Sequence, residues 1–329
     1  MHEDAVYPEA TVLPQSNIYF WRKIKLCKKK ATMLNKTVSA ILFILATTNA
    51  TTTLALPFGS EHALVVEDGT GKILFEKNSD VVVPIASLTK LMTAMVVLDS
   101  KPDMDAPISI DQIDVDIIKH STSHVPIGVT LPRRTVLQLA LMSSDNRAAA
   151  SLARTYPGGN AAFSTAVNAK IQALGMTHTV IEEPTGLSSN NQSTATDLIK
   201  MADAASQYED ITRITTNSKD LININGHTVE YHNTNRLVGK KGWDILLSKT
   251  GFTAEAGRCL IMRINAAGKK ATLVLLNAKA SSSRALDAMN IRRFLSNEPA
   301  LQTVSFTTTK RKRHHLRLSA AKRRHAAQT

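Results

Sequence analysis

Strand-like segments lie at both ends of residues 60–300, with helix-like segments between them. Residues 62–76 contain two apolar runs on either side of a Gly-containing turn, which predicts a β-hairpin. Further strands are predicted near 227–231, 245–250, 258–265 and 271–278, and helices at 84–99, 134–155, 160–174, 194–207 and 282–296. This order predicts an α+β fold, in which one antiparallel sheet collects the first and last strands and packs with helices.

Most of the net charge of +13 lies at the two ends of the 329-residue chain. Residues 1–50 carry seven basic and three acidic residues, and residues 304–329 carry eight basic and no acidic residues. The stretch between them is nearly neutral, with 25 basic and 24 acidic residues. It lacks the interleaved basic and aromatic residues that are typical of nucleic-acid-binding domains, so we expect no specific nucleic-acid partner.

The first 50 residues have the organisation of a leader that contains a secretory signal peptide. An apolar stretch at 38–46 precedes small residues, and cleavage after Ala50 or Ala55 would fit. The stretch has about half the length that a helix needs to cross a bilayer, which favours a cleaved signal over an anchor. The segment before the apolar stretch is unusually long, so we take Met33 as a hypothesis for the true start.

Ser87 and Lys90 lie three residues apart near the start of the predicted helix 84–99, which is largely apolar. Residues at this spacing share one face of a helix, so the Lys90 amine can reach the Ser87 hydroxyl. A serine hydroxyl is a weak nucleophile until a neighbouring base takes its proton. A lysine acts as that base only if burial or a nearby positive charge lowers its pKa, and Lys249 is a candidate for that charge. Taken alone, the pair more often marks a helix start with an exposed lysine.

A second polar motif, Ser144-Asp145-Asn146, interrupts a strongly helical stretch. These residue types are common at the N-caps of helices, so the motif alone is weak evidence of function. Its position inside an otherwise apolar pattern favours a functional interpretation.

A third motif, Lys249-Thr250-Gly251, follows the strand-like segment at 245–247. Lys249 could pair with a carboxylate, Thr250 could donate a hydrogen bond to it, and Gly251 would let a bound peptide approach the backbone. The same three residues would also fit an exposed strand end that has no function. The three motifs together nevertheless combine a nucleophile, its base, a polar cluster and an anion-binding strand in one exported domain.

The three motifs together resemble those of the penicillin-binding proteins and serine β-lactamases. The surrounding residues narrow the resemblance to the low-molecular-mass D,D-peptidases of serine peptidase family S11, and most of all to D-alanyl-D-alanine endopeptidases of the penicillin-binding protein 7 type. The stretches that carry it are 84–94, 141–150, 183–187 and 248–253. The resemblance implies the fold shared by serine β-lactamases and D,D-peptidases, with a catalytic domain at 56–300. It also implies a periplasmic location.

The resemblance implies a serine acyl-transfer mechanism that acts on bacterial cell-wall peptide and that β-lactams inhibit. Ser87 would attack the carbonyl of a D-alanyl peptide bond, and Lys90 would take its proton. Ser144 and Asn146 would relay the proton to the leaving amine and hold the substrate.

The same resemblance assigns substrate binding to the third motif. Lys249 and Thr250 would bind the substrate carboxylate, with Gly251 beside them. The backbone N–H groups of Ser87 and Phe252 would form an oxyanion hole. No cofactor or metal is implied, and the histidines show no zinc-binding spacing.

Several alternatives stay open at this point. A carboxypeptidase that releases terminal D-alanine has the same motifs, and it differs by an additional domain for which the residues after 300 are too few. A β-lactamase would need a group that activates water, for which Glu182 and Glu183 lie in the right interval. A non-catalytic wall binder would be expected to have lost at least one motif residue, and a nucleic-acid binder is disfavoured by the nearly neutral middle of the chain and the predicted signal peptide.

Residues 304–329 form a basic tail with few large apolar side chains. Such a segment cannot bury a hydrophobic core, so we predict that it is disordered. One interpretation is weak contact with an anionic surface, either phospholipid head groups or the wall polymer, which would leave the protein loosely associated with the membrane. The other is a solvated tail without a dedicated partner, and the sequence favours neither.

Overall fold

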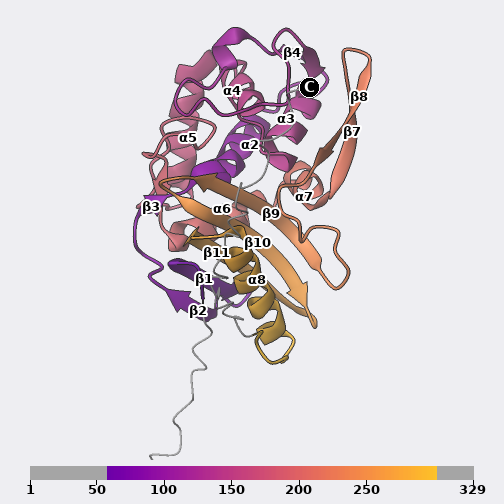
Figure 1. The fold of residues 1–329 in the computed structure, drawn as a ribbon. Helices are drawn as coiled ribbons and strands as arrows, with labels where there is room; N and C mark the ends of the chain where they lie inside the picture. Colours follow the sequence, from indigo (N-terminus) through magenta and orange to yellow (C-terminus); the bar gives the residue numbers. More distant parts are fainter. Residues whose placement is uncertain (1–57, 302–329) are drawn as a thin grey trace, which may run out of the picture. The chain divides into compact units, whose positions relative to one another are not determined.

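A five-stranded antiparallel sheet organises the fold in the computed structural model, which describes residues 58–301 (Figure 1). The strand order is β2-β1-β11-β10-β9. The first two long strands of the chain therefore lie in one sheet with the last three, which confirms the predicted α+β arrangement. The strands are β1 (His62–Glu67), β2 (Ile73–Lys77), β9 (Asp244–Thr253), β10 (Gly257–Ala266) and β11 (Lys269–Ala278).

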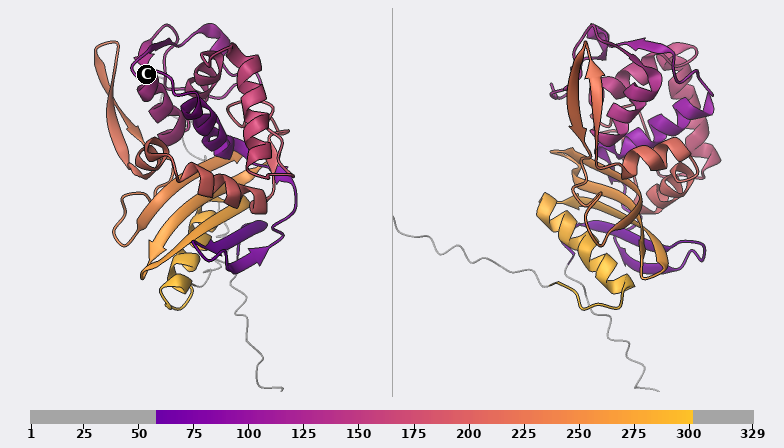
Figure 2. Two further views of the ribbon diagram at one scale, coloured as in Figure 1. Left: turned by 180° about the vertical axis from the view of Figure 1, so that it is seen from behind. Right: turned by 90° about the vertical axis from the view of Figure 1, so that its right-hand side faces the viewer.

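Different helices cover the two faces of this sheet (Figure 2). Successive side chains of a strand point to opposite faces. In β10, Leu260 and Met262 therefore join the apolar cluster of α8 (Ser281–Leu295), whereas Ile261 joins the cluster on the other face. The remaining helices pack on that second face, so the larger part of the core lies between them and the sheet.

The central helix of that larger part is α2 (Thr89–Asp99), which the other helices surround (Figure 2). All of its residues from Thr89 to Val97 are buried, as expected for a helix that is apolar on every side. Side chains at its start are therefore held in fixed positions. The surrounding helices are α3 (Arg133–Met142), α4 (Asn146–Arg154), α5 (Gly159–Ala173), α6 (Ala195–Ala205) and α7 (Glu209–Thr216).

The single helix predicted over 134–155 is wrong, because the structure has two helices, α3 and α4, with a break between them. Ser144 has a φ of 60°, in the left-handed region, which cannot continue a right-handed helix. Asp145 then caps α4, since its carboxylate accepts a hydrogen bond from the N–H of Ala148 at 2.9 Å. The polar motif is itself the break.

The sequence pattern also failed to reveal α7 and the strand β7 (Lys219–Ile224). This strand pairs with β8 (His227–His232) in a two-stranded hairpin. The turn is Asn225-Gly226, with both residues at positive φ, and this dipeptide is a strong hairpin signal that would have found β7. Four strands too short for any periodicity were missed as well: β3 (Val83–Pro84) pairs with β6 (Gln192–Ser193), and β4 (Pro107–Ser109) pairs with β5 (Thr130–Pro132).

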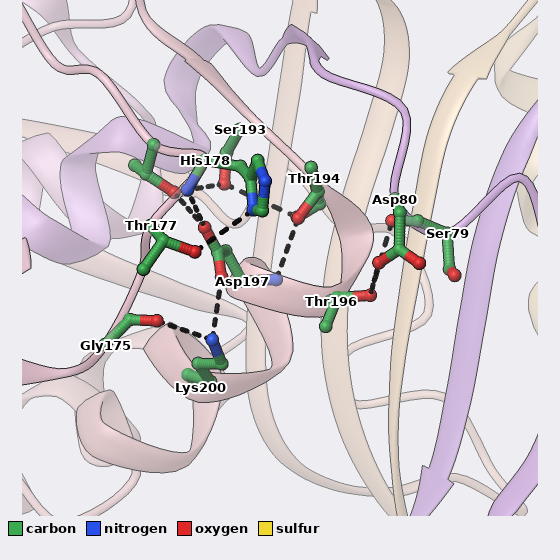
Figure 3. Close-up of polar contacts among 11 residues, drawn as sticks. Ser79, Asp80, Gly175, Thr177, His178, Ser193, Thr194, Thr196, Asp197 and Lys200 are labelled. Atoms are coloured by element: carbon green, nitrogen blue, oxygen red, sulfur yellow. Dashed lines mark hydrogen bonds and ion pairs between the residues drawn. The ribbon is translucent and has the colours of Figure 1, made fainter.

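A buried carboxylate, that of Asp197, holds the start of α6 (Figure 3). It accepts hydrogen bonds from the backbone N–H of His178 at 2.8 Å and from the hydroxyl of Thr179 at 3.0 Å, and it pairs with Lys200 Nζ at 2.9 Å. Thr194 caps the helix by accepting the N–H of Asp197. These partners compensate the cost of burying a charge and attach the segment before α6 to the helix.

No helix within residues 58–301 combines the length and the apolar character needed to cross a membrane. The predicted leader at 1–50, the proposed start at Met33 and the basic tail at 304–329 lie outside the described residues. Those three interpretations stay predictions.

Candidate functional site

Ser87 lies in the short 3-10 helix η2 (Ala86–Leu88), immediately before α2. The helix predicted over 84–99 therefore begins later than expected. Ala86 has a φ of 48°, in the left-handed region that residues other than glycine seldom adopt. Thr89 Oγ1 donates a hydrogen bond to the Ala86 carbonyl at 2.9 Å and helps to hold this strained turn. The turn presents the Ser87 hydroxyl at the start of a buried helix.

Two glycines let distant segments lie against the peptide that carries Ser87. Gly186 has a φ of 86°, and a Cβ atom there would collide with the Ala86 carbonyl and lie 2.8 Å from Ser87 N. A Cβ atom on Gly251, in β9, would lie 3.0 Å from the carbonyl oxygen of Ile85 and 3.1 Å from Ser87 N. Side chains at either position would therefore displace the backbone of Ser87. Gly251, which was expected to admit a bound peptide, is already in close approach to the protein's own backbone.

The Lys90 amine lies beside the Ser87 hydroxyl. Lys90 Nζ is 2.9 Å from Ser87 Oγ, and it also donates hydrogen bonds to Asn146 Oδ1 and to the Thr185 carbonyl, both at 2.6 Å. The residue is only 1% exposed. Burial lowers the pKa of Lys90 from 10.5 to about 8, against the opposing effect of the Glu183 carboxylate. An amine with this pKa is partly unprotonated at neutral pH and can take a proton from a neighbouring hydroxyl.

Ser144 contacts a second buried lysine, Lys249. Lys249 Nζ donates hydrogen bonds to Ser144 Oγ at 2.8 Å and to the Thr250 carbonyl at 2.9 Å. Burial lowers the pKa of Lys249 well below its ordinary value, and the positive charges of Lys90 and Arg284 lower it further. The three motifs of the sequence thus meet around two buried amines.

Asn146 connects Lys90 to a loop that the sequence analysis did not single out. Its Oδ1 accepts from Lys90, and its Nδ2 donates to Ser121 Oγ at 2.8 Å. Asp116 accepts the backbone N–H groups of Ser121 at 2.7 Å and of Lys119 at 3.0 Å. Partial burial raises the pKa of Asp116, but its hydrogen bonds outweigh this effect, so the pKa lies below the ordinary value. The loop therefore holds Ser121 in place beneath the Asn146 amide.

The Ser87 hydroxyl opens into a cleft of about 700 Å³. Lys119, which lines the cleft, forms an ion pair with Glu255 in the turn between β9 and β10, and so joins the loop at 116–121 to the sheet. The residues of the cleft wall that had been predicted as site residues are Ser87, Ser144, Asn146, Thr250, Gly251 and Phe252. Lys90 and Lys249 lie buried next to them, 1% exposed each. The structure thus brings all eight predicted site residues together.

Other cleft residues were not predicted. Three arginines lie here: Arg236 in the loop between β8 and β9, Arg258 in β10 and Arg284 in α8. Single arginines in ordinary elements carry no motif, so only the folded chain reveals that they share a cleft. Across residues 58–301, no three His, Cys, Asp or Glu side chains are grouped so as to hold a metal ion.

Glu183 organises the loop that carries Gly186. Its carboxylate accepts hydrogen bonds from the backbone N–H groups of Gly186 at 2.6 Å and Leu187 at 2.8 Å, and from the Asn191 amide at 3.1 Å. These contacts occupy its acceptor positions. Glu182 is exposed and bonds within the same loop. Neither carboxylate has the free, cleft-facing position that activation of water in a β-lactamase would need.

Comparison with known sequences gives a consistent set of relatives. Residues 48–280 match the sequence model of a family described as D-alanyl-D-alanine carboxypeptidase, peptidase S11. The chain is 44% identical over 276 residues to a D-alanyl-D-alanine endopeptidase of Pseudomonas aeruginosa, covering 80% of this chain and 89% of that protein. It is 40% identical over 279 residues to a D-alanyl-D-alanine endopeptidase of Escherichia coli, covering 84% and 90%. A D-alanyl-D-alanine carboxypeptidase of Bacillus subtilis is 29% identical over 241 residues, covering 70% and 61%.

Solved structures with the same fold include the DD-transpeptidase of Streptomyces K15, with a TM-score of 0.67 and 26% identity over 72% of this chain and 97% of that one. Penicillin-binding protein D2 of Listeria monocytogenes, solved with cefotaxime bound, has a TM-score of 0.61 and 28% identity over 74% and 99%. These likenesses confirm the predicted transpeptidase-type fold.

Proposed function

The chain belongs to the D-alanyl-D-alanine carboxypeptidase family, peptidase S11, and on that premise we propose that it is an endopeptidase that hydrolyses the D-alanyl crosslinks of peptidoglycan through an acyl-enzyme. The observation that carries the chemistry is the buried Lys90 amine, 2.9 Å from the Ser87 hydroxyl and with its pKa lowered to about 8. The choice of crosslinks as substrate is supported by relatives at 44% and 40% identity that are endopeptidases.

Acylation begins with proton transfer from Ser87 to Lys90. The Ser87 oxygen then forms a bond to the D-alanyl carbonyl carbon, and the carbonyl oxygen becomes an oxyanion. The backbone N–H groups of Ser87 and Phe252 stabilise this charge. The support is the close approach of β9, in which a Cβ on Gly251 would lie 3.1 Å from Ser87 N. Donors of this kind contribute about 3 kcal/mol each in serine hydrolases.

The intermediate collapses when the leaving amine receives a proton and the carbon–nitrogen bond breaks. Ser144 relays that proton: its hydroxyl proton passes to the amine, and Lys249 Nζ, which donates to Ser144 Oγ at 2.8 Å, replaces it. Asn146 holds Lys90 through Oδ1 at 2.6 Å and so keeps the base oriented during the transfer. Water then cleaves the ester on Ser87 and releases the D-alanyl product.

The carboxylate next to the scissile bond binds at Thr250, Lys249 and Arg284. Thr250 and Arg284 line the cleft, and the charge of Arg284 acts on Lys249. Arg284 Nη1 donates a hydrogen bond to the Cys259 carbonyl at 2.9 Å, which orients the guanidinium group. A charged donor set of this kind also suits the carboxylate of a β-lactam.

A carboxypeptidase remains the nearest alternative, because it uses the same acyl-enzyme. The carboxypeptidase relative of Bacillus subtilis is only 29% identical, so it fits this chain less well than the endopeptidases do. The β-lactamase alternative is disfavoured by the bound carboxylate of Glu183. A non-catalytic binder is disfavoured by the intact contact between Ser87 and Lys90.

The place of action is the periplasm, a proposal that rests on the signal peptide predicted in the sequence. The basic tail at 304–329 adds weak contact with anionic lipid or with the wall itself.

The proposal is tested with a fluorescent penicillin and two peptidoglycan fragments. Wild-type protein should form a stable adduct on Ser87 and should cleave a crosslinked muropeptide dimer faster than it trims a pentapeptide that ends in D-Ala-D-Ala. Ser87→Ala should lose both activities, whereas Ser189→Ala, an exposed serine outside the cleft, should keep them. Rapid drug hydrolysis without an adduct would indicate a β-lactamase, and preferential trimming would indicate a carboxypeptidase.

A further inference from the structure

The cleft continues beyond Thr250 into a lobe formed by the loop after β8, the start of β10 and the first turn of α8. Three guanidinium groups line this lobe, those of Arg236, Arg258 and Arg284. With Lys119, they make four cationic side chains in a cleft whose lining contains no Asp or Glu among residues 58–301.

Arg258 is held over an aromatic ring rather than by a carboxylate. It lies directly opposite Phe252 in the register of β10 and β9, and its guanidinium carbon is 3.5 Å from the centroid of the Phe252 ring. Stacking fixes the plane of a guanidinium but leaves its N–H groups free to donate. Phe252 is 52% exposed, so this stacked pair faces the open cleft.

Arg236 is placed by a loop that is bonded to the sheet through the residue before it. The buried Asn235 donates from Nδ2 to Ser248 Oγ at 2.8 Å, and its Oδ1 accepts the N–H of Leu237 at 3.1 Å. Asn235 is therefore fixed to β9, and Leu237 is held by Asn235. The side chain of Arg236 is exposed and lines the cleft.

These arginines lack acidic partners, in contrast to other arginines of the fold. Arg154 and Arg263 each contact two aspartates. None of the three cleft arginines forms an ion pair with a carboxylate in the part of the chain that the structure describes. Burial lowers the pKa of Arg284, and the charge of Arg258 lowers it further, so the two cations are close enough to repel. A bound anion would relieve this repulsion.

The chemistry of the two possible substrates differs at this place. When a terminal D-Ala-D-Ala is trimmed, the leaving group is one amino acid with one carboxylate, which Thr250 and Arg284 accommodate. The leaving strand of a crosslink has a carboxylate next to the scissile bond as well, and it has further carboxylates along its peptide. Only the crosslinked substrate therefore brings a second anion to the far side of Thr250.

We propose that Arg258 and Arg236 form a second anion subsite, which binds a further carboxylate of the leaving peptide strand and selects crosslinks over free termini. The subsite rests on the proposed endopeptidase function and deepens it. Arg258 is its fixed donor, stacked on Phe252, and Arg236 closes it from the loop after β8.

The test measures kcat/KM of full-length protein on a crosslinked muropeptide dimer and on a pentapeptide that ends in D-Ala-D-Ala. Arg258→Gln should lower kcat/KM on the dimer about tenfold or more, because a charge-assisted hydrogen bond is lost, and should change the pentapeptide and penicillin rates less than twofold. Arg236→Gln should have the same selectivity with a smaller effect. Lys241→Gln, an exposed cation of the same loop outside the cleft, is the matched control and should change neither.

A dimer whose leaving strand has its distal carboxylates amidated completes a double-mutant cycle. Wild-type protein should lose about the same factor on this substrate as Arg258→Gln loses on the ordinary dimer, and combining the two changes should add little. Equal losses on dimer and pentapeptide, or no loss on the dimer, would overturn the subsite. Failure of wild-type protein to cleave the dimer would instead overturn the endopeptidase function, and the subsite with it.

Discussion

Lys90 and Lys249 are two neighbouring lysines that the fold buries at 1% exposure each. Removing an ammonium group from water disfavours its charged form unless a carboxylate compensates. Glu183 acts in this way on Lys90 and keeps its pKa near 8, whereas Lys249 is surrounded by the positive charges of Lys90 and Arg284. The environment thus fits Lys90 to take up and return a proton near neutral pH.

The first prediction concerns pH. Protonated Lys90 cannot accept the Ser87 proton, and its pKa is about 8. The rate of acylation by penicillin should therefore rise about tenfold per unit between pH 6 and 7.5 and level off above pH 8. Stopped-flow measurement at saturating and limiting drug checks this, with thermal melts at each pH to show that the protein stays folded. A rate that is flat below pH 8, or that keeps rising to pH 10, would contradict the assignment.

Ser121 provides the second prediction. Its hydroxyl accepts the Nδ2 hydrogen bond of Asn146, whose Oδ1 holds Lys90. Ser121→Ala should slow acylation about two- to tenfold and shift the pH midpoint, since a hydrogen bond of this kind contributes about 1 kcal/mol. Ser121→Thr, which keeps the hydroxyl, should restore both. Thr122→Ala changes an exposed neighbour and serves as control; an unshifted pH profile in Ser121→Ala would show that the serine has only a structural role.

Sequence reasoning predicted site residues that lie in short motifs, such as Ser87 and Lys90, and the structure brings these two into contact. It could not identify Ser121 or Arg258. The partner of Ser121 is 25 residues away along the chain, and the approach of Arg258 to Arg284 depends on packing of α8 against the sheet. Contacts of this kind leave no local pattern, because a serine or an arginine in a loop or strand is ordinary without its neighbours.

At the scale of secondary structure, periodicity located the long elements and failed at their interruptions. The apolar pattern runs through 134–155 without showing that a left-handed residue stops the helix at Ser144. The same interruption places Ser144 and Asn146 beside the two buried lysines, which a continuous helix would not do. The strand β7 was missed, although its partner β8 was predicted, because most of the β7 side chains are polar or exposed and show little of the alternation that marks a strand.

The third prediction concerns α6 and its buried carboxylate. Asp197→Ala removes the acceptor of the His178 N–H and of the buried Thr179 hydroxyl, whereas the partly exposed Lys200 keeps its bond to the Gly175 carbonyl (Figure 3). The free energy of unfolding should fall by about 2 kcal/mol, as expected when hydrogen bonds to a charged acceptor are lost. Asp80→Ala, which removes the exposed partner of Thr196 in the same region, should cost less than about 0.5 kcal/mol. Urea unfolding of both variants makes the comparison, and equal losses would show that the Asp197 contacts are not what stabilises this segment.

At the scale of the described fold, the nucleophile is held where three distant segments meet. The loop at 182–191 contributes Gly186, and the edge strand β9 contributes Gly251. Both approach the backbone of Ala86 and Ser87 more closely than a side chain would permit. The position of Ser87 relative to the proposed oxyanion donor of β9 is therefore set by the packing of helices against the sheet and not by the turn alone.

The fourth prediction uses two glycines with nearly the same backbone conformation. Gly186 has a φ of 86° and Gly128 a φ of 84°. Alanine at either position should therefore lower the free energy of unfolding by about 1 kcal/mol, because a residue with a Cβ atom disfavours the left-handed conformation. A Cβ atom on Gly128 meets no atom within 4 Å, whereas one on Gly186 collides with the peptide of Ala86 and Ser87. Gly128→Ala should therefore lose stability only, whereas Gly186→Ala should lose at least as much stability and most of its penicillin acylation at temperatures where it is folded. Because both variants share the conformational cost, the difference between them isolates the contact with Ser87. Normal acylation by folded Gly186→Ala would mean that the loop at 182–191 does not position the nucleophile.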